Sequence, residues 1–309
     1  MVTPRFDRRD FLVFATGAAL SSCTGGPRPL QPRSLGDAIA ALEGRGRLGV
    51  AVLDTGTGHV DGYRLDERFA LCSTFKLVLA AAVLARAAAG TRPLDATVRV
   101  TEADLIHNAP VTRSLVEAAA ARGERAATVD LATLAHGMQT TSDGAAANLL
   151  LRDLGGLAAF RDFCRAHGDT TTRLDRFEPD MNAVHDGDER DTTTPRAMAQ
   201  LVARLMGEGG LPAGPRRTLR QWLIETATGA ARIRAGLPAD WIAGDKTGTG
   251  GGGPSAVTVK VNDVVWAEPP GRAPLVVAAY YETYAVAEWP TAAQEAVLAD
   301  VGRLVAAHA

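Results

Sequence analysis

Lysine is nearly absent from this chain of 309 residues. It holds 33 basic residues, yet only three are lysines: Lys76, Lys246 and Lys260. Where arginine is the usual cation, a lysine marks a position that needs a compact charge or an amine able to lose its proton. The formal charge of −2 gives no reason to expect nucleic acid as a partner. The three lysines are therefore the first candidates for chemistry.

Cysteine and histidine are too few and too scattered for a disulfide framework or a metal centre. If Cys23 is lipidated or removed, only Cys72 and Cys164 remain, and no spacing signature links them. The six histidines form no HxH or HxxxH pair, and the chain has no CxxC. The sequence thus argues against a zinc hydrolase, and we expect neither a metal nor another cofactor.

The sequence shows no apolar run long enough to span a bilayer. The short apolar run near the N-terminus is typical of an export signal over residues 1–22. The motif Arg8-Arg9-Asp10-Phe11-Leu12 resembles a twin-arginine signal, and the apolar stretch after it is too short to span a bilayer. Leu20-Ser21-Ser22-Cys23 is typical of a lipoprotein cleavage site that leaves Cys23 for acylation, with ordinary signal cleavage as the alternative. Residues 23–33 are typical of a tether. We expect an exported protein that is periplasmic, secreted or held at the membrane by a lipid anchor.

Strand patterns lie near both ends of the rest of the chain, and helical patterns lie between them. Leu48–Tyr63 predicts a hairpin around the glycines of Asp54–Gly58. Helices are predicted at about 73–90, 131–138, 143–154, 157–167, 195–206, 215–224 and 291–307, and strands at 241–243, 257–266 and 274–281. The glycine-dense Gly248–Gly253 segment is expected to be a turn.

This order of elements favours an antiparallel sheet built from both chain ends, flanked by terminal helices, with an all-α insertion. The expected division is an α/β domain over residues 34–72 and 216–309 and an all-α domain over residues 73–215. A site would lie between the two parts, where clefts commonly form.

Three short motifs combine hydroxyl and amine groups. Ser73-Thr-Phe-Lys76 places a hydroxyl and an amine three residues apart, on one face if Ser73 opens a helix. Ser142-Asp-Gly144 follows at a helix start, and Lys246-Thr-Gly248 follows the predicted strand at 241–243. Alone, each motif is also compatible with an ordinary surface serine or lysine.

In this order, the motifs resemble those of class A β-lactamases and penicillin-binding proteins. The resemblance implies that Ser73 is the nucleophile, that Lys76 or Glu178 takes its proton and that Ser142 relays a proton to the β-lactam nitrogen. Lys246 and Thr247 would then bind the substrate carboxylate. Asp143 would instead be structural, with its carboxylate capping the following helix.

The segment Arg176-Phe-Glu-Pro-Asp-Met-Asn182 resembles the Ω-loop of class A β-lactamases, here residues 176–191. The resemblance implies that Glu178 activates the water that releases the acyl-enzyme and that Asn182 helps to hold this water. Arg176 and Asp191 lie where the family has an ion pair that closes the loop. Taken alone, Glu178 is also compatible with a solvated surface loop.

The resemblance extends over nearly all of the exported part and implies a monomer with a five-stranded sheet. It places Arg232, Gly248 and Thr249 near the substrate carboxylate, although Arg234 is an alternative to Arg232. The backbone N–H groups of Ser73 and Thr249 would form the oxyanion hole.

The sequence departs from the family at a few positions. Gly144 stands where most relatives have asparagine, which predicts a roomier and less discriminating acyl-side pocket. Asn108 lies where relatives often have an aromatic side chain, and Phe177 replaces a tryptophan. The segment Arg113–Ala127 is about two helical turns longer than usual.

The resemblance predicts a hydrolase of penicillins and cephalosporins, and two alternatives share its motifs. A D-Ala-D-Ala carboxypeptidase or transpeptidase has the same three motifs, but Glu178 and Asn182 argue against it. A sensor that is acylated and stays acylated would lack the Glu178 arrangement and would be joined to a transmembrane segment.

Overall fold

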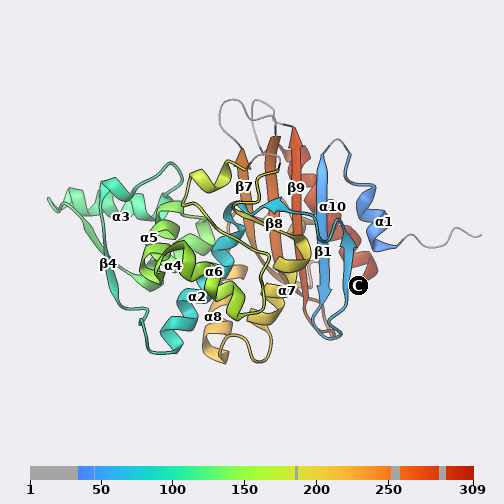
Figure 1. Cartoon of the computed structure of the whole chain (residues 1–309), viewed down its shortest axis with the longest axis horizontal. Coiled ribbons are helices and arrows are strands. Elements are labelled where there is room, and N and C mark those ends of the chain that lie inside the picture. Colours follow the sequence, from blue (N-terminus) through green and yellow to red (C-terminus); the bar gives the residue numbers. More distant parts are fainter. Residues whose placement is uncertain (1–33, 45, 185–186, 252–257, 285–289) are drawn as a thin grey trace, which may run out of the picture. The chain divides into compact units, whose positions relative to one another are not determined.

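A five-stranded antiparallel sheet joins the two ends of the chain in the computed structural model (Figure 1). The structure describes residues 34–44, 46–184, 187–251, 258–284 and 290–309. The strand order is β2-β1-β9-β8-β7, with β1 Arg47–Asp54, β2 Val60–Tyr63, β7 Ile242–Gly251, β8 Thr258–Glu268 and β9 Leu275–Tyr284. The predicted sheet from both chain ends is thus confirmed. The export signal, the tether and Cys23 lie outside the described residues.

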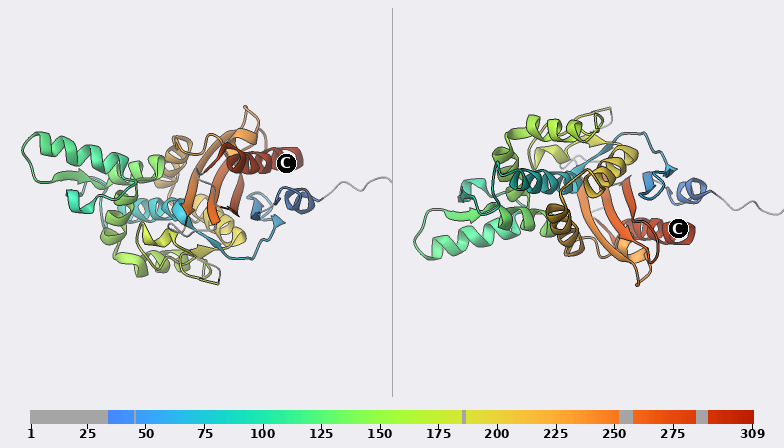
Figure 2. Two further views of the ribbon diagram at one scale, coloured as in Figure 1. Left: turned by 90° about the horizontal axis from the view of Figure 1, so that it is seen from above. Right: turned by 90° about the horizontal axis from the view of Figure 1, so that it is seen from below.

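The terminal helices cover one face of this sheet (Figure 2). They are α1 Leu35–Ala40 and α10 Ala292–His308, together with the short α9 Ile233–Gly236. Their apolar side chains form a core with alternate residues of β1, β8 and β9, as the two-residue period of a strand requires. In the ranges that the structure describes, no helix is long and apolar enough to cross a membrane.

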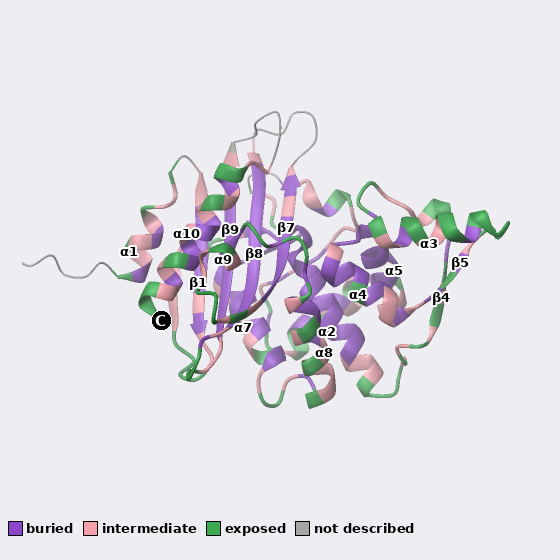
Figure 3. Ribbon diagram, turned by 180° about the vertical axis from the view of Figure 1, so that it is seen from behind, coloured by how far each residue is buried: buried purple, intermediate pink, exposed green. Residues whose placement is uncertain are grey.

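The helical block packs around α2 Phe75–Ala88, which lies in contact with α4, α5, α6 and α8. The other helices of this part are α3 Pro110–Ala121, α4 Leu131–Thr141, α5 Gly144–Leu154, α6 Gly156–Ala166, α7 Pro195–Met206 and α8 Ala213–Ile224. Apart from its last turn, α2 is buried, like the central strands of the sheet (Figure 3). Its rich content of alanine, leucine and valine allows a helix that is buried on nearly all sides.

Two small sheets were not expected from the sequence, and three of their four strands lie in the part that it assigned to helices. β3 Phe69–Ala70 pairs with β6 Thr192–Thr193, and β4 Thr97–Val100 pairs with β5 Ala127–Asp130. Strands of two to four residues leave no periodic pattern, so the sequence did not predict them. The first of these pairs matters for function, because it joins the chain that leads into Ser73 to the end of the Ω-loop.

The domain division stays a prediction. Helix α7, which the sequence placed in the helical part, packs against β1 and β9. One apolar core also contains side chains from both parts, such as Leu79 of α2 and Tyr280 of β9. Two further expectations were wrong: the Lys246-Thr-Gly248 motif lies inside β7, not after a strand, and Gly248–Gly251 continues that strand instead of turning.

Candidate active site

Ser73 belongs to a group of two serines and two lysines, which we call the serine–lysine cluster (Ser73, Lys76, Ser142 and Lys246). Lys76 Nζ donates hydrogen bonds to Ser73 Oγ at 3.0 Å and to the Ser142 carbonyl oxygen at 2.8 Å. Lys246 Nζ donates to Ser142 Oγ at 3.1 Å from the opposite side. Ser142 Oγ also accepts from Lys76 Nζ at 3.3 Å, so the two ammonium groups share one hydroxyl.

The local backbone brings these side chains together. Ser73 lies in a 3-10 turn, Cys72–Thr74, and Lys76 lies in the first turn of α2, so a spacing of three residues puts both on one face. Ser142 ends α4 in the left-handed region at φ 61°, immediately before α5 begins. Cys72 is also left-handed, at φ 43°. Such strained residues persist where the surrounding packing fixes them, and both flank or belong to the cluster.

Asp143 fixes the corner between α3 and α5. Its carboxylate accepts from Ala146 N at 2.9 Å and so caps α5. It also accepts from Val111 N at 2.9 Å and Thr112 N at 2.8 Å in the first turn of α3. One buried carboxylate thus holds two helix N-termini beside Ser142, an arrangement that the helix dipoles favour.

Glu178 brings a carboxylate to the cluster from the Ω-loop. Its Oε1 lies 3.0 Å from Lys76 Nζ and accepts from Ser73 Oγ at 3.3 Å, while its Oε2 accepts from Asn182 Nδ2 at 2.7 Å. Burial raises the pKa of this carboxyl group, but the Lys76 ammonium and the hydrogen bonds outweigh burial and hold the pKa below its usual value. Glu178 is therefore ionised at neutral pH.

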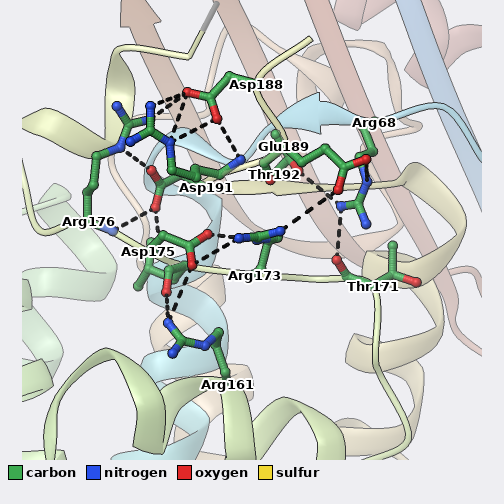
Figure 4. A network of polar contacts seen from close by, with 12 residues as sticks. Arg68, Arg161, Thr171, Arg173, Asp175, Arg176, Asp188, Glu189, Asp191 and Thr192 are labelled. Carbon is green, nitrogen blue, oxygen red and sulfur yellow. Dashed lines mark hydrogen bonds and ion pairs between the residues drawn. The ribbon is translucent and has the colours of Figure 1, made fainter.

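The Ω-loop is closed at its neck by Asp191 (Figure 4). This buried carboxylate lies 2.5 Å from Arg176 Nε and also accepts from the backbone N–H groups of Asp175 at 2.6 Å and Arg176 at 2.9 Å. Asp175 bonds in turn to Arg173 and Arg161, which links the neck to α6. The pair that the resemblance placed here therefore belongs to a larger network.

Asn148 on α5 holds Glu178 itself, and sequence reasoning assigned it no role. Its Nδ2 donates to the Glu178 carbonyl oxygen at 2.9 Å, and its Oδ1 accepts from Glu178 N at 3.0 Å. The signal in the sequence is a single asparagine within an apolar run of alanines and leucines, where a side chain is expected to be buried. Because buried amides are normally hydrogen-bonded, such a residue predicts a partner without identifying it.

Strand β7 forms the other wall of the site. Burial, reinforced by the charge of Lys76, lowers the pKa of Lys246 to about 7. Thr247 Oγ1 lies 2.6 Å from Thr228 Oγ1. Gly248 allows β7 to pass close to the 3-10 turn Cys72–Thr74, since a Cβ at Gly248 would lie 3.0 Å from the Leu71 carbonyl oxygen.

Arg232 reaches the site through Thr249. Its guanidinium donates to Thr249 Oγ1 at 2.7 Å and to the carbonyl oxygens of Gly248 at 3.0 Å and Asn262 at 2.8 Å. Glu295 of α10 pairs with it at 3.1 Å. Arg234, the alternative, pairs with the buried Asp245 at 2.7 Å instead. Of the two arginines, only Arg232 contacts a residue of the predicted carboxylate site.

The space beside Gly144 differs from the expected roomier pocket. A Cβ at Gly144 would lie 2.6 Å from Ile106 Cδ1 and 3.2 Å from the Asn108 carbonyl oxygen. The side chain of Asn108 donates to the Ser142 carbonyl oxygen at 2.8 Å, beside the Lys76 bond to the same atom. Ile106 therefore fills the position that a side chain at 144 would take. Across the ranges with described coordinates, no three His, Cys, Asp or Glu side chains gather as a metal site.

Comparisons with known proteins agree with this geometry. Residues 34–309 match the family described as the β-lactamase enzyme family. Beta-lactamase CTX-M-8 of Citrobacter amalonaticus is 41% identical over 273 residues, which cover 87% of this chain and 89% of that protein. Beta-lactamase L2 of Stenotrophomonas maltophilia is 41% identical over 317 residues, with 96% and 97% covered.

Solved structures give the same result. An ancestral class A β-lactamase, named GNCA, superposes with a TM-score of 0.81 at 47% identity, covering 89% of this chain and all of that one. The putative class A β-lactamase PenP from Rhodopseudomonas palustris has a TM-score of 0.80 at 42% identity, with 89% and 99% covered. The chain belongs to the class A β-lactamase family.

Proposed function

We propose that this enzyme hydrolyses the β-lactam amide of penicillins and cephalosporins through an acyl-enzyme on Ser73. The observation that carries the proposal is the ionised Glu178 carboxylate 3.3 Å from Ser73 Oγ, within the same contact network as Lys76. A serine and a lysine suffice to form an acyl-enzyme. A carboxylate that can activate water beside it allows its release.

In the acylation step, Ser73 Oγ attacks the β-lactam carbonyl carbon and gives its proton to the Lys76–Glu178 pair. The negative charge that develops on the carbonyl oxygen is stabilised by the backbone N–H groups of Ser73 and Thr249. The C–N bond of the ring then breaks, and the ring nitrogen takes a proton from Ser142 Oγ. Ser142 recovers a proton from Lys76 or Lys246, since both contact its hydroxyl.

The substrate carboxylate is bound by the wall that β7 forms. Lys246 supplies a charge, and Thr247 and Thr249 supply hydroxyl groups for hydrogen bonds. Arg232 orients the Thr249 hydroxyl and adds a second positive charge behind it. Lys246 is buried, and its Nζ contacts Ser142 Oγ and the Thr247 carbonyl oxygen but no carboxylate within 4.0 Å among the described residues, so an anionic ligand would supply the missing partner. This explains why Lys246 is a lysine buried in the sheet.

In the deacylation step, Glu178 takes a proton from a water molecule, which attacks the ester carbonyl of the acyl-enzyme. Asn182 donates to Glu178 Oε2, and its own amide oxygen is buried without a hydrogen-bond partner among the described residues, so Asn182 can hold the water together with the carboxylate. The ester C–O bond then breaks and Ser73 Oγ takes back its proton. The depressed pKa of Glu178 keeps it in the form that accepts a proton.

Intact-protein mass spectrometry after mixing with a penicillin tests the proposal. The wild type should convert the substrate and carry little persistent adduct, whereas Glu178→Gln should accumulate an adduct on Ser73. The Gln side chain keeps the size and polarity of Glu178, so an adduct on this variant reflects the loss of the carboxylate and not a change in the fold. A long-lived adduct on the wild type would favour a D,D-peptidase or a sensor instead.

We further propose that the enzyme acts after export, as a monomer, with a lipid anchor at Cys23. The support is the twin-arginine-like motif and the Leu20-Ser-Ser-Cys23 segment. Metabolic labelling with a fatty acid should label the wild type and not Cys23→Ser, while both retain hydrolysis. Release of unlabelled wild type into the medium would instead favour ordinary signal cleavage.

A further inference from the structure

Lys260 is the third lysine of the chain and lies outside the serine–lysine cluster. It belongs to β8, in register with Gly250 of β7 on one side and Glu282 of β9 on the other. Its side chain is buried, with 3% of the residue exposed. Its Nζ donates a hydrogen bond of 3.0 Å to the carbonyl oxygen of Val184, which is part of the Ω-loop. The sheet is thereby tied directly to the loop.

Val184 is held in two ways, and it follows Asn182 by two residues. Its side chain packs in a small apolar cluster with Ala70 and Cys72, the residues that lead into Ser73. Its carbonyl oxygen accepts from Lys260. A displacement of Val184 would therefore move Asn182, whose amide contacts Glu178 Oε2. The bond from Lys260 acts close to the part of the loop that carries the hydrolytic groups.

A cavity of about 340 Å³ lies next to this bond. Ala70, Val184 and Lys260 line it, together with Thr258 and Glu282 of the sheet. The loop and the sheet are therefore not packed continuously here, and apolar contacts cover only part of the approach. Where packing is incomplete, a directional hydrogen bond from a charged donor can set the height of the loop above the sheet.

The Ω-loop is anchored differently at its other points. Asp191 closes the neck, and Asn148 holds the backbone of Glu178 in the first limb. Asp191 thus joins the two ends of the loop and Asn148 holds Glu178 itself. Lys260 instead contacts Val184, which follows Asn182 in the loop. We propose that Lys260 is a positioning residue for deacylation: through Val184 it holds Asn182, and with it the hydrolytic water, at the distance that Glu178 requires.

The inference rests on the proposed function, because it assumes a hydrolytic water between Glu178 and Asn182. It predicts a selective effect. Acylation uses the serine–lysine cluster and Glu178, whose backbone Asn148 holds independently of Lys260, so its rate should be preserved. Deacylation also needs Asn182 and should slow. A lysine that only stabilised the fold would affect both steps alike.

The test separates the two steps in Lys260→Met, which keeps the length and volume of the side chain and removes the donor. Rapid-quench mixing with a penicillin, followed by intact-protein mass spectrometry, gives the rate at which the Ser73 adduct forms and the rate at which it disappears. We expect disappearance to slow about tenfold, as for the loss of one hydrogen bond to a charged donor, with formation unchanged within about twofold. Lys260→Arg, which retains a charged donor, should restore part of the loss.

Val277→Ala is the matched control, since it opens a void in the core under α10, on the far side of the sheet from the Ω-loop. It should lower the melting temperature without changing the ratio of the two rates. Equal slowing of both steps in Lys260→Met, or none in a folded variant, would overturn the inference. If Lys260→Met does not fold, Lys260→Gln replaces the charged donor by a shorter, uncharged one and should slow disappearance alone, by a smaller factor. A wild type that stays acylated would overturn the proposed function instead.

Discussion

The two halves of the site are built in different ways. The serine–lysine cluster lies on helix ends and on the edge strand β7, where the surrounding elements fix each side chain, and its members are at most 8% exposed. The hydrolytic half, Glu178 and Asn182, lies on a loop whose position depends on a few polar contacts. Helices and strands with many neighbours open rarely, whereas loops held by few contacts open at a lower cost in free energy.

This difference predicts that the two chemical steps respond differently to mutation. Changes in the cluster should remove acylation, which needs the nucleophile and its neighbours. Changes at the anchors of the Ω-loop should slow release more than they slow acylation. The structural contrast between core and loop therefore predicts a difference between the rates of acylation and deacylation. Variants with successively smaller expected effects test this difference.

Ser73→Ala should have the largest effect. Without the hydroxyl no acyl-enzyme forms, and hydrolysis should fall by at least about 10⁴-fold, as when a nucleophile is removed from comparable hydrolases. Steady-state rates with a chromogenic cephalosporin and mass spectrometry of the protein measure this. An unchanged melting temperature would show that the fold is intact. A residual adduct at another residue would contradict the assignment of Ser73.

Asn148→Leu should affect the other half of the site. The change removes two hydrogen bonds to the Glu178 backbone and leaves that N–H and C=O without their partner. Deacylation should slow about 100-fold, corresponding to two hydrogen bonds. Acylation should slow less, because the Lys76 ion pair still holds the Glu178 carboxylate for that step. Rapid-quench measurements of both rates check this. If acylation fell as much as deacylation, the separation between the two halves would be wrong.

The titration of Lys246 should limit activity at alkaline pH. Burial and the charge of Lys76 lower its pKa to about 7, so above pH 7 the free enzyme loses the charge that would pair with the substrate carboxylate. The kcat/KM value should therefore fall up to about tenfold per pH unit above this pKa. Lys246→Arg, which stays charged, should lose this alkaline limb even if its activity is lower. An identical profile in the two proteins would assign the limb to another group.

The same shift has a consequence for stability. Because the pKa of Lys246 is lower in the folded protein than the usual 10.5, unfolding takes up a proton between these two values. This group alone therefore makes the fold more stable as pH rises from 7 toward 10.5.

Gly144→Asn should have the smallest effect. A side chain at this position must displace Ile106, whose Cδ1 lies 2.6 Å from the site of the new Cβ, and this end of the side chain can move. The added amide should raise the preference for substrates with an acylamino group over substrates without one by about fivefold, as for one hydrogen bond. Competition between one substrate of each kind measures the ratio. Equal ratios in the two enzymes would show that Gly144 does not control discrimination.

The sequence predicted the sheet and the longer helices because their patterns repeat over many residues. The hairpin at β1 and β2, the start and end of α7 and the final helix α10 appear close to the predicted positions. The position of Lys246-Thr-Gly248 was wrong because three glycines in five residues weaken the strand pattern. Here the pairing with β8 decides the conformation, and pairing is not visible in a local window.

The sequence motifs name candidate residues of the site but not the contacts between them. The motifs name Ser73 and Glu178, but not that Glu178 lies within hydrogen-bonding distance of Ser73 from 105 positions away. Asn148 and Lys260 could not be assigned, since each acts on a backbone atom that is remote in the sequence. Contacts to a backbone place no demand on the partner's residue type, so they leave no paired pattern to find.

The pairing of β1 with β9 also bears on the order in which the protein can be made and folded. Arg47 lies opposite Glu282, so the first strand of the sheet has only β2 as a partner until the last part of the chain exists. Contacts across such sequence separations form late, because the entropy of closing the long loop opposes them. A growing chain would carry the finished nucleophile helix α2 well before Lys246 and β9 were present. Synthesis of an active enzyme is thus completed only by its C-terminal third, and a chain that stops early leaves an unpaired strand edge open to aggregation.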